Sequence, residues 1–592
     1  MTDLLFYDIE VFKYNSMVVF KDLEGKTVRV FSSSLDGLGD YIDKGLIKGQ
    51  GFKDLDEFLQ GKTLVGYNNY FYDDYILYAM SMNFDQEIIK TWNDSIIQGL
   101  SDVNMKKINT CRTYDAFQQI DVSRPGLKKV EGNMGRSIVE SSVDFNLDRP
   151  LSPAENLETL KYCEYDVLQT IEIYKMRHEY FSSKEKIIDM MDEERLRDKA
   201  YKWNTTSIVG QILKPRRKTP SRRLVSDEFL EMVPYDVQEM WRQLDKTFDF
   251  KFKKKKVIVE EFGNVVEFGW GGLHGAPKGF VKKENVKLVD VSSMYPNILI
   301  ILNGLNDKTE EYKDILDYRL QLKHEGKKEE QAPYKLILNS TYGLLNNQYS
   351  QLNNPHLAYS ICIYGQISLY VLSQRLASIG AEIININTDG VAYCYDGDED
   401  LKILRAWEQE FKLNLEVYYF KKWIQKDVNN YIAVTENDYI LVKGGDVNKY
   451  HQDRFFANND IRITHIALVD YLIYGKPVQD TLIENVDKPI LYQYVLQAGS
   501  TYQGVVMYDE PDKLLNTKIN RVFATNKGGQ IVKKREDGGL VKFADTPDKM
   551  YVYNGDLEEF EEFKEIIDLQ WYYDLTIKNL KRWQWWIRKE KI

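Results

Sequence analysis

One short stretch, EIININTDGVAYCYDG at residues 382–397, constrains the fold more than any other part of the chain. Isoleucines and asparagines alternate before Asp389-Gly390, and the alternating Val391 and Tyr393 follow it. An Asp-Gly pair between two alternating runs is the strongest short-range signal of a β-hairpin, because both residues tolerate the left-handed backbone of a tight turn. The sequence therefore predicts an antiparallel hairpin with Asp389-Gly390 as its turn. The hairpin alone leaves open whether Asp389 also does chemistry.

The length and composition are those of a large globular protein. A chain of 592 residues, 43% hydrophobic and 29% charged, predicts two to four domains with sizeable cores. No apolar run is long enough to span a bilayer, and the first residues, MTDLLFYDIEVF, lack the basic start of a signal peptide, so we expect no membrane partner and a cytoplasmic protein. The cysteines are widely spaced without a CxxC pair, which argues against a zinc site or disulfides: Cys111, Cys163, Cys362 and Cys394.

The net charge of −11 does not decide whether nucleic acid is a partner. Phosphate binding depends on local basic stripes rather than on the total charge. Each stripe could equally be a solvated face. Three such stripes are present: KPRRKTPSRR (214–223), KFKKKK (251–256) and KKWIQK (421–426).

Three segments in the first third of the chain each carry a polar pair on one face. Asp8 and Glu10 lie two residues apart in the expected strand LLFYDIEVF, so their side chains share one face. Taken alone, this pair fits an edge strand with solvated acids equally well. Two more pairs follow at i,i+4 spacing: Asn69 with Asp73, and Tyr162 with Asp166.

Four carboxylates in this order suit a site in which two divalent metal ions act on a phosphodiester. The set resembles the DEDD-type 3′→5′ proofreading exonucleases of the tyrosine subclass, and the resemblance implies an RNase H-like domain. The chain departs from that family at Gly126, where a hydroxyl residue is usual, and near Glu140, where protein-primed relatives carry a lysine. The resemblance implies Asp8, Glu10, Asp73 and Asp166 as metal ligands, Tyr162 as the water-positioning group, and Asn69 as a contact to a single-stranded DNA 3′ end.

A second constellation begins with an aspartate inside the apolar strand KLVDVSSMYPNILIIL (287–302). A buried, unpaired carboxylate is costly, so Asp290 is not expected there for packing. The segment resembles the first palm motif of family B DNA polymerases, D-x-x-S-L-Y-P. The resemblance implies that Asp290 and the Val291 carbonyl bind metal, and that Tyr295 excludes a 2′-hydroxyl from the nucleotide site.

A cationic helix follows in YKLILNSTYGLLNN (334–347), where Lys335, Asn339 and Tyr342 share one helical face. By itself this face could hold a solvated lysine and a satisfied core amide. The segment resembles the second family B motif, K-x-x-x-N-S-x-Y-G, which implies that Lys335 and Asn339 bind the nucleotide and that Tyr342 and Gly343 contact DNA. Arg319 and Lys323, on a preceding expected helix, would add two cations for a triphosphate.

The hairpin takes the place of the third family motif, D-T-D-S. The resemblance implies Asp389 as a metal ligand, whereas Asn387 replaces the first acid and is not expected to bind metal. Two weaker resemblances imply further DNA contacts. They are Lys426 and Tyr431, which resemble the primer-holding K-x-Y element, and Gly271 and Gly272 in FGWGGLHG, which resemble the Y-x-G-G segment with Trp270 near the expected tyrosine.

The resemblance covers residues 8 to about 445 and predicts a multidomain α/β protein with an exonuclease domain and a right-hand polymerase. The start of the exonuclease motifs near residue 8 favours a phage or plasmid enzyme. Asp290 and Lys335 lie only 45 residues apart, which leaves no room for the large insertion of protein-primed polymerases. The expected parts are the exonuclease domain (1–180), a connecting region (181–268), the palm (269–305 and 356–440), the fingers (306–355), and the thumb with the C-terminal region (441–592).

We therefore expect a DNA-directed DNA polymerase with a proofreading exonuclease that replicates phage or plasmid DNA in the host cytoplasm. Each active site would use two Mg²⁺ ions, with Mn²⁺ as an alternative. The expected partners are primer-template DNA, dNTPs and a single-stranded DNA 3′ end, with the chain acting as a monomer alongside accessory replication proteins. Two alternatives stay open: a 3′→5′ DNA exonuclease with a non-catalytic polymerase-like half, and a non-catalytic replication scaffold.

Overall fold

The computed structural model describes residues 4–100, 104–247, 254–453, 455–456, 460–515 and 518–583. The expected mixed α/β multidomain class is confirmed, and the chain forms two compact units. Unit 1 comprises residues 1–204, 454–461 and 485–571, and unit 2 comprises residues 205–453, 462–484 and 572–592. Residues 251–253 of one basic stripe and residues 584–592 at the end of the expected thumb lie outside the described residues. In the described part, no helix is both long and apolar enough to cross a bilayer.

A five-stranded sheet forms the centre of unit 1, in the order β3-β2-β1-β4-β5. The central strand β1 pairs parallel with β4 and antiparallel with β2; β5 extends the parallel side and β3 the antiparallel side. Asp8 and Glu10 interrupt the otherwise apolar β1. Because β1 is the central strand, these acids lie in the middle of the sheet and not at its edge. The strands are β1 (Leu4–Val11), β2 (Ser16–Lys21), β3 (Thr27–Ser32), β4 (Thr63–Gly66) and β5 (Arg112–Asp115).

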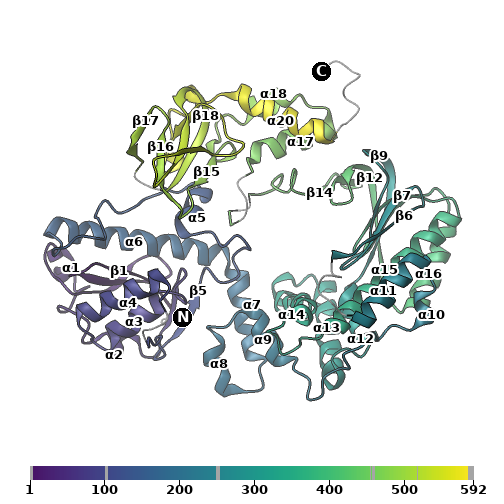
Figure 1. The fold of residues 1–592 in the computed structure, drawn as a ribbon, viewed down its shortest axis with the longest axis horizontal. Helices are drawn as coiled ribbons and strands as arrows, with labels where there is room; N and C mark the ends of the chain where they lie inside the picture. Colours follow the sequence, from purple (N-terminus) through teal and green to yellow (C-terminus); the bar gives the residue numbers. More distant parts are fainter. Residues whose placement is uncertain are drawn as a thin grey trace. The chain divides into compact units, whose positions relative to one another are not determined.

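Helices cover both faces of this sheet (Figure 1). Alternate residues of β1 point to opposite faces: Tyr7 packs with α3 and α4, and Phe6 packs with α6. Ser152 begins α6 with a capping box completed by Glu155, which satisfies backbone N–H groups at the helix start. The helices of unit 1 are α1 (Gly39–Asp43), α2 (Leu55–Leu59), α3 (Asp73–Ser81), α4 (Gln86–Gln98), α5 (Leu127–Met134), α6 (Pro153–Met176), α7 (His178–Asp189), α8 (Glu194–Ala200) and α19 (Phe563–Ile566).

The last part of unit 1, residues 485–571, forms a β-subdomain of two small antiparallel sheets. Both sheets contribute to one apolar cluster, which includes Val505 from one sheet and Val522 from the other. The strands are β15 (Tyr494–Gln497), β18 (Ile519–Gly529) and β21 (Met550–Val552) in one sheet, and β16 (Tyr502–Met507), β17 (Glu510–Leu514), β19 (Ile531–Arg535) and β20 (Leu540–Lys542) in the other.

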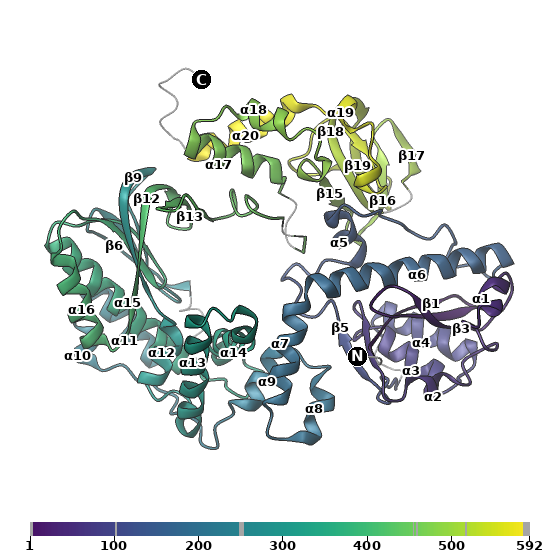
Figure 2. The same cartoon turned by 180° about the vertical axis from the view of Figure 1, so that it is seen from behind.

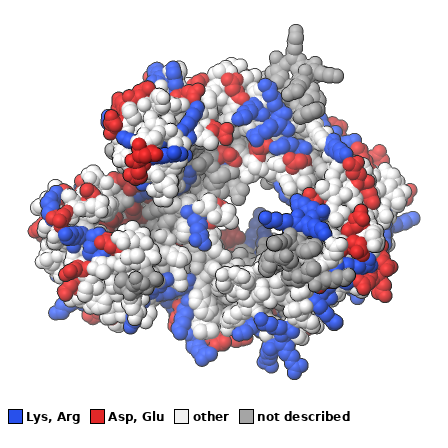
Figure 3. Space-filling model, in the orientation of Figure 1, with Lys and Arg blue, Asp and Glu red and all other residues white. Residues whose placement is uncertain are grey.

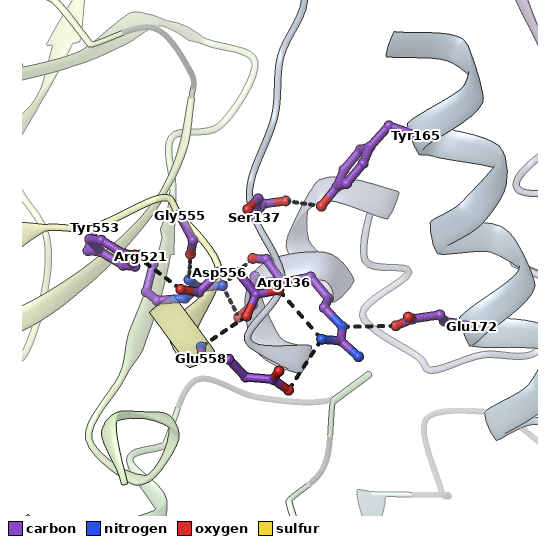
Figure 4. Close-up of polar contacts among 10 residues, drawn as sticks. Arg136, Ser137, Tyr165, Glu172, Arg521, Tyr553, Gly555, Asp556 and Glu558 are labelled. Atoms are coloured by element: carbon purple, nitrogen blue, oxygen red, sulfur yellow. Dashed lines mark hydrogen bonds and ion pairs between the residues drawn. The ribbon is translucent and has the colours of Figure 1, made fainter. Parts of the chain in front are cut away.

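The β-subdomain packs against α5 through a buried arginine (Figure 4). The guanidinium of Arg521 donates to the carbonyl oxygens of Gly132 at 3.0 Å and Gly555 at 2.6 Å, and also to that of Arg136. A Cβ atom on Gly132 would lie 2.8 Å from Val495 of β15, so glycine permits this close approach. Helix α5 is therefore held from one side by residues that lie more than 350 positions later in the chain.

A nine-stranded antiparallel sheet forms the centre of unit 2, in the order β14-β13-β12-β9-β11-β10-β8-β7-β6. Strands β6 and β7 come from the segment expected to connect the domains, yet they belong to this sheet. The strands are β6 (Val257–Glu261), β7 (Asn264–Phe268), β8 (His274–Ala276), β9 (Val281–Val291), β10 (Glu382–Asn387), β11 (Gly390–Cys394), β12 (Leu415–Asp427), β13 (Asn430–Thr435) and β14 (Ile440–Lys443).

The helices α11, α15 and α16 lie on one side of this sheet (Figures 1 and 2). Helix α15 is buried along most of its length, whereas α13 and α14 pack side by side and carry the residues expected in the fingers. The helices of unit 2 are α9 (Thr205–Ile212), α10 (Asp227–Leu230), α11 (Tyr235–Thr247), α12 (Met294–Ile301), α13 (Thr309–His324), α14 (Lys328–Asn346), α15 (Pro355–Ser378), α16 (Glu399–Phe411), α17 (Arg462–Tyr474) and α18 (Val478–Glu484); α20 (Leu569–Trp583) begins in unit 1 and ends in unit 2.

Candidate active sites

The end of β9 and the β10–β11 hairpin bring Asp290 and Asp389 to one cavity of unit 2. Asp290 pairs with Gly390 of β11, and the backbone N–H of Val291 donates to the carbonyl oxygen of Asp389 at 2.7 Å. The cavity has a volume of about 290 Å³. The expected metal and nucleotide residues Asp290, Val291, Tyr295, Arg319, Lys323, Lys335, Asn339 and Asp389 all line it, together with Ser292, Ser293, Met294, Pro296, Leu338, Thr388, Glu416 and Tyr418.

The predicted hairpin is confirmed, but its turn is shifted by one residue. Asn387 pairs with Gly390, so Thr388 and Asp389 form the turn, and Thr388 takes the left-handed backbone at φ +63°. A Cβ atom on Gly390 would lie 3.2 Å from Asp290 Oδ1. Glycine at this position therefore leaves room for the Asp290 carboxylate and does not supply the turn.

Cationic side chains from α13 and α14 line the same cavity as the two acids. Lys335 and Asn339 are exposed on one face of α14, as the i,i+4 spacing predicts. Arg319 donates to Ser293 Oγ at 3.0 Å, and its buried Nε has no hydrogen-bond partner among the described residues. Lys323 pairs with Glu416 at 2.7 Å. The cavity thus combines carboxylates with cations, which is the combination that a metal-bound triphosphate needs.

Burial and mutual repulsion perturb the acids of this cavity. Burial, and then the charges of Asp389 and Glu416, raise the pKa of Asp290 to about 7. Burial also raises the pKa of Asp389, against a lowering by Lys443. For Glu416, burial is outweighed by the hydrogen bonds from Lys323 and Tyr418, so its pKa is lowered. A bound divalent cation would relieve the repulsion on Asp290, and oxygen ligands suit Mg²⁺ or Mn²⁺.

Two residues of this site escaped the sequence analysis. Glu416 lies directly opposite Asp290 in the β9–β12 register. Lys443 pairs with Tyr431 in the β13–β14 register and lowers the pKa of both Asp290 and Asp389. Both residues are brought to the acids by strand pairing, and a single sequence does not show which strands pair.

The expected primer-contacting residues lie in different environments. Lys426 pairs with Asp446 at 2.9 Å and does not line the cavity. Tyr431 is 8% exposed and stacks on Trp423 with ring centroids 4.4 Å apart. Tyr342 packs against Tyr295 at 4.6 Å, which places it behind the expected nucleotide site.

The glycines expected to contact DNA differ in their surroundings. A Cβ atom on Gly272 would lie 2.6 Å from the Thr388 backbone, so this glycine lets its segment pack against the Asp389 turn. The carbonyl of Gly271 accepts from Gln366 of α15 at 2.7 Å. Gly343 is exposed, and a Cβ atom added there would extend into open space.

Asn387 binds the turn that follows β12. Its amide donates to the carbonyl oxygen of Val428 at 2.8 Å, and the side chain is 7% exposed. The neighbouring Asn385 donates to the same carbonyl at 3.1 Å and to Gln425 at 2.8 Å. The asparagines of β10 therefore tie the hairpin to β12 and to the turn after it, and Asn387 is not among the residues that line the cavity.

A second carboxylate cluster lies on the sheet of unit 1. Asp8, Glu10 and Asp166 offer oxygen atoms within 4.8 Å of one another, from the adjacent elements β1 and α6. Asp73, the first residue of α3, is close enough for its charge to raise the pKa of Glu10. The structure thus brings three of the four expected acids into one group, with Asp73 nearby, and the oxygen donor set of that group fits a divalent cation.

Burial dominates the electrostatics of this cluster. It raises the pKa of Asp8 to about 8, with a further contribution from Asp166. Burial raises the pKa of Asp73 and Glu10 well above their usual range, and carboxylate repulsion adds to both shifts. Burial also raises the pKa of the Tyr162 phenol, so this side chain stays a neutral hydrogen-bond donor.

Lys128 of α5 lies inside the same cluster, which the sequence analysis did not foresee. Its ammonium group contacts Asp166, pairs with Glu131 at 3.2 Å, and lies 4.7 Å from the Tyr162 ring centroid. Burial raises the pKa of Asp166, against hydrogen bonds from Lys128 and Tyr162. The segment that departs from the family pattern at Gly126 thus supplies a cation two residues later.

Asn69 occupies a buried position rather than an exposed one. It is 1% exposed and precedes α3, and its amide donates to Asp74 Oδ1 at 3.0 Å. The carboxylate of Asp74 also accepts from Tyr7 at 2.9 Å and Thr113 at 3.1 Å. This network ties the segment before α3 to β1 and β5 and thereby fixes Asp73 at the helix start.

Comparison with known proteins gives distant similarity to DNA polymerases. No protein-family model matches the chain. DNA polymerase 2 of Aeropyrum pernix is 20% identical over 371 residues, which are 53% of this chain and 44% of that protein, so the match spans less than half of that relative's length. The solved structure of the family B DNA polymerase from the hyperthermophilic archaeon Pyrobaculum calidifontis is similar over 98% of this chain and 77% of that one, at 14% identity and a TM-score of 0.42. With identities this low, the function of the chain rests on the residues of its two sites.

Proposed function

We propose that the chain is a family B DNA-directed DNA polymerase with a 3′→5′ proofreading exonuclease, serving the replication of phage or plasmid DNA. One observation carries the proposal: Asp290 and Asp389 share a single cavity with Arg319, Lys323 and Lys335. These residues come from four segments between positions 290 and 389, so their convergence is a property of the fold. Asn387 lies outside this cavity lining and gives no support to a non-catalytic polymerase half.

In this proposal the residues of the unit 2 cavity bind and orient a dNTP. Asp290, the Val291 carbonyl and Asp389 would hold Mg²⁺, which supplies charge neutralisation at the transferred phosphate when bound. Arg319 and Lys335 would pair with the triphosphate, because they line the same cavity as the two acids. Tyr295, fixed against Tyr342, would form the wall next to the sugar and exclude a ribose hydroxyl.

The acids of unit 1 would hold Mg²⁺ for removal of a mismatched 3′ nucleotide. The five-stranded order β3-β2-β1-β4-β5, with its parallel β1, β4 and β5, supports an RNase H-like domain. Tyr162, kept neutral by burial, would orient the attacking water. Lys128 would neutralise part of the carboxylate charge.

Separate variants test the two activities in the full chain. Asp389→Asn should lower primer extension by at least about 100-fold with dNTPs and Mg²⁺, while degradation of a single-stranded 3′ end persists. Asp8→Asn should give the opposite pattern. The exposed Asp396, just after β11, offers a matched control, because Asp396→Asn removes an acid of the same hairpin outside the cavity lining. Normal extension by Asp389→Asn would refute the polymerase assignment, and normal degradation by Asp8→Asn would refute the exonuclease assignment.

A further inference from the structure

The loop between α9 and α10 carries an unusual concentration of positive charge in a chain of net charge −11. We call residues 214–222 the basic loop. Among the described residues, none of its cations forms an ion pair, whereas the next residue, Arg223, pairs with both Asp227 and Asp245 at 2.7 Å. Figure 3 shows Lys and Arg side chains gathered along the lower edge of the view. The exposed cations of the basic loop are Lys214, Arg216, Arg217, Lys218 and Arg222.

The backbone of the basic loop is held in place by polar side chains, of which Thr219 and Asn354 are buried. Thr219 donates to the carbonyl oxygen of Gly304 at 2.5 Å, and Asn354 donates to the carbonyl oxygen of Thr219 at 3.1 Å. Asn306 donates to the carbonyl oxygen of Arg217 at 3.1 Å. The carboxylate of Asp307 accepts from the backbone N–H of Arg216 at 3.0 Å and so is directed at the main chain.

These tethers make the loop a preorganised array of cations. Like charges held close together repel one another, and a fixed backbone prevents them from separating. A polyanion that neutralises the array gains electrostatic energy, while the entropy of ordering the backbone has already been lost on folding. A mobile solvated loop would need none of the contacts made by Thr219, Asn306 and Asn354.

Helix α12 connects the basic loop to the cavity of unit 2. The helix begins at Met294 and Tyr295, which line the cavity, and it ends at Ile301, shortly before Gly304. The eight residues of α12, at a helical rise of about 1.5 Å, give a separation of about 12 Å between the two ends of the helix. Phosphates of one strand follow each other at about 3.4 Å along a duplex, so this separation corresponds to roughly four nucleotides.

We propose that the basic loop binds the phosphates of a nucleic-acid strand that also occupies the cavity of unit 2. The inference rests on the proposed polymerase function and adds a second contact region to it. Arginine forks bind phosphate through paired hydrogen bonds, and such contacts position a strand without reading its sequence. The strand is either the single-stranded template ahead of the primer or the primer-template duplex, and both present the same phosphate chemistry.

The test compares salt dependence of binding for the full chain and two matched variants. The loop variant carries Arg216→Gln, Arg217→Gln, Lys218→Gln and Arg222→Gln, all at exposed positions. The control variant removes four exposed lysines of unit 1, with Lys26→Gln, Lys44→Gln, Lys48→Gln and Lys53→Gln. Binding of labelled primer-template is measured between about 50 and 200 mM salt, with a long single-stranded template overhang in one arm and a blunt duplex in the other.

The loop variant should lose about 0.7 of the log–log salt slope per phosphate contact on single-stranded DNA, or about 3 for four contacts, while the control variant keeps the full slope. A slope change with the overhang alone identifies the single-stranded template, and an equal change with the blunt duplex identifies the duplex. The inference would be overturned if the loop variant kept the full slope in both arms, or if it bound only polyglutamate more weakly. Normal primer extension by the unmodified chain would leave the proposed function standing in either case. If the unmodified chain showed no salt-dependent DNA binding, the proposed function would be overturned as well.

Discussion

Replacing Arg521 by methionine should loosen helix α5 and disturb the acid cluster of unit 1. Arg521 is fully buried and donates from β18 to four acceptors, which belong to Gly132, Arg136, Gln493 and Gly555. Helix α5 also carries Lys128, which contacts Asp166. The substitution therefore removes a support of the helix that carries Lys128.

The expected loss follows from two opposing terms. Four acceptors lose their donor, at about 1–3 kcal/mol each. Burial lowers the pKa of Arg521 to about 10, which corresponds to a cost of roughly 3 kcal/mol for burying the charge, and methionine avoids that cost. The hydrogen bonds dominate, so we expect a net loss of about 4 kcal/mol in the local stability around α5, or roughly a thousandfold faster opening.

Hydrogen exchange measures this opening directly, because a chain of two units need not unfold in one step. Amides of α5 should exchange roughly a thousandfold faster in Arg521→Met, while amides of α14 in unit 2 stay unchanged. Arg521→Lys keeps a cation with fewer directed donors, so its α5 amides should exchange at a rate between those of the unmodified and Arg521→Met chains. Equal α5 exchange in the unmodified and Arg521→Met chains would refute the reasoning, as would equal acceleration in α14.

Three further predictions concern the acids and their neighbours. Tyr295→Val should raise ribonucleotide incorporation relative to dNTPs by about 10- to 200-fold, and an unchanged ratio would refute the role of Tyr295 as a wall next to the sugar. Gly390→Ala should lower primer extension by about 100-fold without changing exonuclease activity, because the added methyl would press on Asp290 Oδ1 at 3.2 Å; unaltered extension would contradict it. On folding, the pKa of Asp290 rises to about 7 and that of Asp8 to about 8. Between about pH 4 and 8 the metal-free folded state therefore holds protons that the unfolded chain has released. The stability of the folded state consequently falls as pH rises through this range. Mg²⁺ should therefore raise the melting temperature more at about pH 8 than at about pH 5.5, and equal shifts would argue against these acids as the binding site.

Local sequence patterns predicted which side chains share a face within one strand or helix. The i,i+2 spacing of Asp8 and Glu10 and the i,i+4 spacing of Lys335 and Asn339 follow from strand and helix geometry alone. The hairpin was predicted on the same basis, although its turn is formed by Thr388 and Asp389 and Gly390 begins β11 next to Asp290.

Pairings between distant segments were not predictable in this way. Glu416 faces Asp290 because β12 pairs with β9, and a different register would have placed another residue there. The buried position of Asn69 depends on Asp74, which is held by β1 and β5 together. Lys128 and Arg521 act through packing between segments separated by 38 to 389 positions, and periodicity within one element carries no information on that packing.

The late position of Arg521 in the sequence also delays the packing of α5 during synthesis of the chain. Gly132 of α5 leaves the ribosome 389 residues before Arg521, its hydrogen-bond partner. At a synthesis rate of about 5–20 residues per second, α5 waits roughly 20–80 s for that partner. During this interval the sheet of unit 1 can form, but one side of α5 remains uncovered. A nascent chain stalled before β18 should therefore expose α5 to proteases or chaperones, even though every acid of the unit 1 cluster has already been made.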